Sequence, residues 1–148
     1  MPNISTITVN GTNYDVADSV ARNIVNNTAD YVVDKNSSVV GNTTWFYRKW
    51  NSGTAECWCQ YTFSATANNA WGSLFDSEAI SLPAFPFTFA EVPQVFLSSG
   101  KCDYSMLIER GSQYGWATES SPGLMWVIRP VSTNNGIYRV NIYAIGKV

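Results

Sequence analysis

The sequence predicts a mainly β protein, an antiparallel β-sandwich of jelly-roll-like type preceded by a short N-terminal hairpin and helix. After Asn42, apolar and polar residues alternate with period two, and turn residues interrupt the alternation roughly every 8–12 residues, which is typical of an all-β sandwich or barrel. The 148 residues also suffice for one ordinary domain with its own core, so we expect folding without a disulfide or a metal.

The composition limits the function. Charged residues make up 14% of the chain, below the average for soluble domains, and aromatic residues also make up 14%. Histidine is absent, which excludes Ser-His-Asp and Cys-His catalytic sites and His-containing zinc sites on this chain alone. The formal net charge is −2 and the basic residues are scattered, so no nucleic-acid partner is expected. Little charge and many aromatic residues favour a subunit interface, hence a homo-oligomer.

We expect no secretory signal, because residues 1–10 lack a basic segment followed by an apolar one, and we expect synthesis in a cytoplasm. No run approaches the roughly 18 apolar residues of a membrane span, so membrane insertion is not expected. Cys57, Cys59 and Cys102 are interpreted as small buried residues in a reducing compartment, since no fourth Cys or His ligand exists for a metal. No cofactor is predicted.

The first predicted element is a hairpin. Residues 5–9 and 14–16 are the predicted strands on either side of Asn10-Gly11, and Ile7, Val9 and Tyr14 alternate around that step. Because Asn and Gly both accept positive φ, this step is a strong signal for a two-residue hairpin turn.

A helix is predicted next, from Asp15 or Val16 to Asn26 or Asn27. Val16, Val20 and Ile24 recur at helical spacing, but they form only a thin apolar stripe, which suits burial against a neighbouring subunit. Residues 28–42 are rich in Asp, Asn, Ser and Thr and are interpreted as an extended connector. The predicted domains are therefore residues 1–42, for attachment or trimerisation, and residues 43–148, the β-sandwich head.

The head begins with a predicted hairpin of two strands, Thr43–Trp50 and Gly53–Phe63. Glu56 is expected to form a cross-strand ion pair with Arg48 or Lys49. Trp58 is the exception on an otherwise polar face, so it covers a second layer, contacts a subunit or lies exposed as a binding surface. The opposite face is the predicted core: Ala55, Cys57, Cys59, Tyr61 and Phe63.

The rest of the head is predicted as loops and short strands. Residues 65–77, around Trp71, are predicted to form a long loop. The segment Ile80–Pro93 contains three prolines, which cannot donate to a strand ladder, so it is predicted as an edge, a bulged strand or a packed loop.

Trp126 lies in a strand with apolar residues on both faces, which predicts an internal position or an interface. The further predicted strands are Gln94–Ser99, Tyr104–Arg110, Gly115–Glu119, Leu124–Arg129 and Gly136–Ile145.

Aromatic residues in turn-rich stretches are the candidate ligand contacts. Trp71, Tyr114 and Trp116 could stack on sugar rings, or they could close the ends of the sandwich or a subunit seam. Asp76 and Glu78 form a conceivable carboxylate pair for glycoside hydrolysis, but their simpler interpretation is solvated surface charge.

A resemblance to a known family emerges from three segments. The run WFYRKWNSGTAECW, from Trp45 to Trp58, resembles the aromatic hairpin of tail-fibre and minor structural proteins of Firmicutes phages and prophages. The runs LPAFPFTF and VPQV, within residues 82–95, are similar to an element that follows in those distal fibre domains. The run ITVNGTNYDVADSVAR, residues 7–22, resembles the opening of phage baseplate and tail proteins. Cys59 departs from the pattern, which has Gly there.

The resemblance implies a non-enzymatic virion protein of the tail exterior, assembled in the bacterial host cytoplasm. Its expected form is a homotrimeric head that binds a bacterial surface glycan or another virion component. In the family's hairpin, Gly53 would serve the turn and Trp50 and Trp58 would serve packing, with no catalytic residue to carry over. The alternatives are a lectin-like carbohydrate-binding module, a purely architectural capsid or tail decoration protein, and a glycosidase based on carboxylates.

Overall fold

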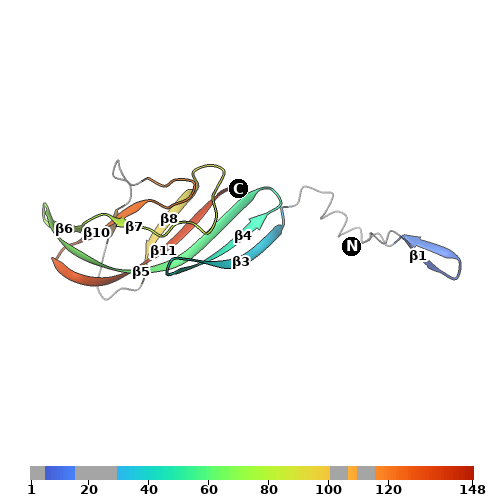
Figure 1. The fold of residues 1–148 in the computed structure, drawn as a ribbon, viewed down its shortest axis with the longest axis horizontal. Coiled ribbons are helices and arrows are strands. Elements are labelled where there is room, and N and C mark those ends of the chain that lie inside the picture. Colours follow the sequence, from blue (N-terminus) through green and yellow to red (C-terminus); the bar gives the residue numbers. More distant parts are fainter. Residues whose placement is uncertain (1–5, 16–29, 101–106, 110–115) are drawn as a thin grey trace. The chain divides into compact units, whose positions relative to one another are not determined.

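The structure is a computed structural model that describes residues 6–15, 30–100, 107–109 and 116–148. All the regular secondary structure in these ranges is β-strand, so the mainly β prediction is confirmed (Figure 1). None of the described residues forms a helix that could cross a membrane. The chain divides into two units, Met1–Tyr31 and Val32–Val148.

Within the first unit, β1 (Thr6–Val9) and β2 (Thr12–Asp15) form a hairpin, which confirms that prediction. The turn residues Asn10 and Gly11 have φ values of 53° and 77°. Positive φ at both positions matches the right-handed twist of the two strands. The predicted helix, beyond Asp15, lies outside the described residues.

The second unit begins with three antiparallel strands, β3 (Val32–Val40), β4 (Thr43–Trp50) and β5 (Thr54–Trp71). β3 lies within the segment predicted as a connector, so this unit begins at Val32 and not after Asn42. The sequence did not reveal this strand because most β3 side chains face solvent, and an exposed strand carries the same polar residues as a loop.

β5 runs far beyond the predicted end of its strand, and the predicted loop over residues 65–77 is wrong. β5 continues to Trp71, and β6 (Leu74–Ser77) returns antiparallel to it after a turn in which Gly72 has a φ of 62°. Within the extension, Ala67 is fully buried in a small cluster with Val127 and Tyr138. Sequence alone does not distinguish a small buried residue from a small loop residue.

The remaining strands are β7 (Ile80–Ser81), β8 (Gln94–Ser99), β9 (Leu107–Glu109), β10 (Leu124–Arg129) and β11 (Thr133–Lys147). The strands predicted at β8, β10 and β11 are confirmed. Of the predicted strand Tyr104–Arg110, only β9 is described.

The strand predicted at Gly115–Glu119 is wrong for its described residues, 116–119, which form no strand. Thr118 Oγ1 accepts hydrogen bonds from the backbone N–H groups of Ser120 and Ser121. The side chain therefore holds a local turn there in place of a strand ladder.

Among the described residues, β3 to β11 form one connected antiparallel sheet that curls along the long strands β5 and β11 (Figure 1). Five neighbouring strands of this sheet, which carry the surface described below, have the order β3-β4-β5-β11-β8. The sandwich arrangement and its jelly-roll-like detail stay predictions.

The main core lies between one face of this sheet and the proline-rich segment after β7. Leu82, Phe85 and Phe89 of that segment are buried, so it is a packed loop, one of the predicted possibilities. Phe85 meets Trp45 edge to face, with ring centroids 5.8 Å apart. Burying each of these rings contributes about 1.5–3 kcal/mol, so the loop is part of the domain's stability. The sheet contributes Trp45, Ala55, Cys57, Cys59, Met125, Val140, Ile142 and Ala144.

Candidate binding surface

The strand face opposite the core carries the candidate site. On β5, Cys57 and Cys59 point into the core, so Glu56, Trp58 and Gln60 lie on the outer face. The same alternation applies to β4, β8 and β11. Because these strands pair in register, their outward side chains line up in rows across the sheet.

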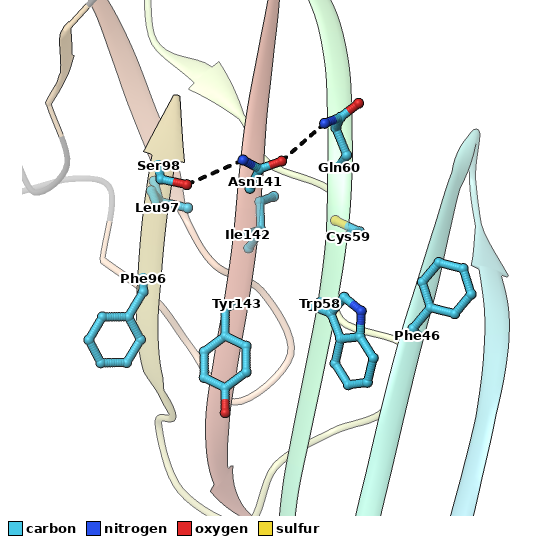
Figure 2. Close-up of a pocket in the computed structure, with 10 residues that line it drawn as sticks. All are labelled: Phe46, Trp58, Cys59, Gln60, Phe96, Leu97, Ser98, Asn141, Ile142 and Tyr143. Atoms are coloured by element: carbon cyan, nitrogen blue, oxygen red, sulfur yellow. Dashed lines mark hydrogen bonds between the residues drawn. The ribbon is translucent and has the colours of Figure 1, made fainter. Parts of the chain in front are cut away.

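Four aromatic side chains occupy one such row, which we call the aromatic row: Phe46, Trp58, Tyr143 and Phe96. Phe46 of β4 is opposite Trp58 of β5, Trp58 is opposite Tyr143 of β11, and Tyr143 is opposite Phe96 of β8. The ring centroids of Phe46 and Trp58 are 6.2 Å apart, and those of Phe96 and Tyr143 are 6.1 Å apart. Figure 2 shows the rings side by side across four strands.

The aromatic row is open to solvent. Phe46 is 48% exposed and Phe96 is 56% exposed, while Trp58 and Tyr143 between them are half-buried. A shallow depression of about 520 Å³ follows the row. Its lining contains no Asp, Glu, Lys or Arg and consists of Phe46, Trp58, Cys59, Gln60, Phe96, Leu97, Ser98, Asn141, Ile142 and Tyr143.

A second row, the polar row, borders the aromatic row on one side and comprises Gln60, Asn141 and Ser98. Gln60 Nε2 donates to Asn141 Oδ1 at 3.1 Å, and Asn141 Nδ2 donates to Ser98 Oγ at 3.3 Å (Figure 2). All three side chains are exposed. These bonds fix the orientation of both amides, so their remaining donors and acceptors have defined positions.

An ion pair borders the aromatic row on the other side. Arg48 Nε donates to Glu56 Oε1 at 2.5 Å, so the predicted cross-strand pair forms with Arg48. The Tyr143 hydroxyl donates to the other oxygen of Glu56. Glu56 is 5% exposed, and its carboxylate has two charge-assisted partners, which offset its desolvation.

The ion pair also orders the aromatic row. The Arg48 guanidinium lies 5.4 Å from the ring centroid of Trp58 and 5.6 Å from that of Trp50. Burial, followed by the hydrogen bond to Glu56, raises the pKa of Tyr143 to about 12. The phenol is therefore neutral at physiological pH, and its hydroxyl serves as a fixed donor.

The residues predicted for interface or structural roles lie on several elements. Trp50 ends β4 and is half-buried beside Arg48. Gly53 lies in the following turn with a φ of 73°, and its N–H donates to the Trp50 carbonyl at 3.0 Å. Trp126 is half-buried on β10, opposite Glu109 of β9. Only Glu56 and Trp58 of the predicted set belong to the surface described above.

The predicted glycan contacts lie elsewhere. Trp71 is the last residue of β5 and is 52% exposed, and Trp116 lies before β10 and is 71% exposed. Tyr114 lies outside the described residues.

Phe46, Tyr143 and Phe96 were not predicted from the sequence as site residues. A signal for Phe46 was present, because pairing Arg48 with Glu56 across the hairpin also places Phe46 opposite Trp58, two residues along each strand. No comparable signal existed for Tyr143 and Phe96, since β8, β11 and β5 are far apart in sequence.

The described residues offer no cluster of three His, Cys, Asp or Glu side chains that could hold a metal ion. The two described cysteines, Cys57 and Cys59, are buried free thiols, and burial raises the pKa of each to about 12. Such thiols are poor nucleophiles and poor metal ligands at neutral pH.

No family model and no curated protein matches this chain. Among solved structures, the chain is similar to an N-truncated R1-type pyocin tail fibre, with 16% sequence identity over 88% of this chain and 96% of that one and a TM-score of 0.49. It is also similar to a P. aeruginosa R1 pyocin fibre, with 18% identity, a TM-score of 0.49 and coverage of 92% of this chain and 32% of that one. A likeness of this size assigns no function to the chain.

Proposed function

We propose that this chain is a non-enzymatic structural protein of a phage virion, of the tail-fibre or receptor-binding type. In this proposal it forms a homotrimer on the exterior of the tail and recognises a bacterial surface glycan or another virion component. It is assembled in the host cytoplasm. The attachment or trimerisation role expected for residues 1–42 falls, in this proposal, to the part that precedes β3, residues 1–31.

The aromatic row is the observation that supports this proposal best. The row leaves uncharged aromatic surface in contact with water, above all at Phe46 and Phe96, and contiguous apolar patches on soluble proteins mark interaction surfaces. Two of the rings, Phe46 and Trp58, belong to the hairpin that resembles the hairpin of Firmicutes phage fibre proteins. The segment that carries the resemblance therefore supplies two of the four rings of the aromatic row.

Size-exclusion chromatography with light scattering tests the assembly. The intact chain at micromolar concentration is expected to elute with three times the 16.4 kDa mass of one chain. A monomer under these conditions contradicts the trimer.

The genetic setting tests the virion role independently of the oligomeric state. Genes for tail and lysis proteins are expected beside this one, and the protein is expected in purified particles by mass spectrometry. Its absence from particles produced by the host would contradict the virion role. A lectin-like module would instead bind soluble oligosaccharide as a monomer.

A further inference from the structure

We propose that the aromatic row and the polar row together bind an uncharged polysaccharide, with its chain lying across the strands. This inference rests on the proposed function and deepens it, because it names the glycan class and moves the contact from the predicted Trp71, Tyr114 and Trp116 to the outer face of the sheet.

The aromatic row suits the apolar side of a sugar chain. A pyranose ring has a face of C–H groups that stacks on an aromatic ring, and Figure 2 shows the four rings side by side across four strands. Neighbouring strands are about 4.8 Å apart, so rings on four of them cover about 14 Å. That length suits several linked sugar units better than one monosaccharide.

The polar row suits the hydroxyl groups of the same chain. After the bonds from Gln60 to Asn141 and from Asn141 to Ser98, each amide nitrogen still has a second N–H to donate. Sugar hydroxyls both donate and accept, so they match amides and a serine without a fixed polarity. The internal bonds hold these groups in place before binding, which lowers the entropy cost of recognition.

The charge of the surface selects an uncharged chain. The depression has no ionised side chain in its lining, and Arg48 and Glu56, which border the aromatic row, form an ion pair with each other. Acidic polysaccharides and nucleic acids are normally held by basic side chains at the binding site. Nothing in the lining supplies such a contact.

A second copy of this chain suits the surface less well. A protein interface would cover the exposed amides of Gln60 and Asn141 and would need a matched partner for each spare N–H. A buried donor without a partner costs about 1–3 kcal/mol, whereas the hydroxyls of a sugar, or water at its edge, satisfy these groups.

The test is a glycan array that carries neutral and acidic bacterial polysaccharides, probed with the intact protein. We expect binding to neutral glycans. For the best of them, Phe96→Ala and Asn141→Ala should each weaken the affinity about tenfold, equivalent to about 1.4 kcal/mol. Phe96 is exposed, so its truncation should leave the fold intact, which circular dichroism verifies. Ile137→Ala is the matched control, since Ile137 is an exposed apolar residue of β11 outside both rows and should change the affinity less than about twofold.

Three results would overturn the inference: no binding to any neutral glycan, binding confined to acidic glycans, or loss of affinity in Trp71→Ala or Trp116→Ala with Phe96→Ala unaffected. Dissociation of the trimer by Phe96→Ala would also overturn it, because the surface would then be a subunit interface. Each of these results leaves the virion role standing. That role fails separately, if the protein is absent from particles although the array shows neutral glycan binding through Phe96.

Discussion

Phe46 and Trp58 lie opposite each other on β4 and β5, with ring planes inclined by only 22°. The core side chains on the same two strands, Trp45 and Cys57, are fully buried on the other face. The hairpin is therefore aromatic on both faces for different reasons. One face holds the domain together, and the other leaves Phe46 exposed to solvent.

The contact between Phe46 and Trp58 should be measurable as a coupling energy. Aromatic pairs across strands are worth about 0.5–1.5 kcal/mol beyond their burial. A double-mutant cycle of Phe46→Ala and Trp58→Ala, read by urea unfolding, should give a coupling of that size. Additive effects of the two substitutions would show that the rings are neighbours without a stabilising contact.

Glu56 is expected to be the most sensitive charged residue on this face. Glu56→Gln keeps the shape but weakens the bonds from Arg48 and Tyr143, so the free energy of unfolding should fall by about 1–3 kcal/mol. The matched control is Glu91→Gln, an exposed carboxylate, with a change within about 0.5 kcal/mol. Equal effects for both variants would contradict the role given to the ion pair.

The proline-rich loop is expected to be as important for stability as a strand. Phe89 is 2% exposed and meets Phe85 and Phe87 at ring centroid distances of 5.2 and 5.0 Å. Phe89→Ala should lower the free energy of unfolding by about 3–5 kcal/mol. Phe96→Ala removes the same ring from an exposed position and serves as the control. If the two variants unfold at similar urea concentrations, the loop does not pack on the core as described.

Tyr143 is expected to make the free energy of unfolding depend on pH in the alkaline range. Its pKa is raised from 10.0 to about 12 in the folded protein, so its contribution to stability is complete below pH 10 and disappears as pH rises towards 12. Tyr143→Phe should flatten the loss of stability in this range and remove one late-titrating phenol from the ultraviolet absorbance titration. An unchanged titration curve in that variant would contradict the raised pKa of Tyr143.

The sequence predicted what is local. The turn at Asn10-Gly11, the β4–β5 hairpin and the inward face of β5 all follow from neighbouring residues and period-two alternation. β3 and the second half of β5 were missed, because an exposed edge strand and a strand with a buried Ala67 resemble loops in composition. Only Phe46 and Trp58 of the aromatic row could have been placed together from the sequence, since Phe96 and Tyr143 join the row through pairings between strands distant in the chain.

In the proposed function, the aromatic row is open in the assembled protein and is covered when ligand binds. Hydroxyl-radical footprinting of the native assembly, with and without the neutral glycan selected on the array, measures this directly. We predict that Phe46, Trp58, Tyr143 and Phe96 are oxidised in the free assembly and protected by the glycan, while Trp116 is oxidised equally in both. Protection of the four residues already in the free assembly, or protection of Trp116 alone on adding glycan, would contradict the claim.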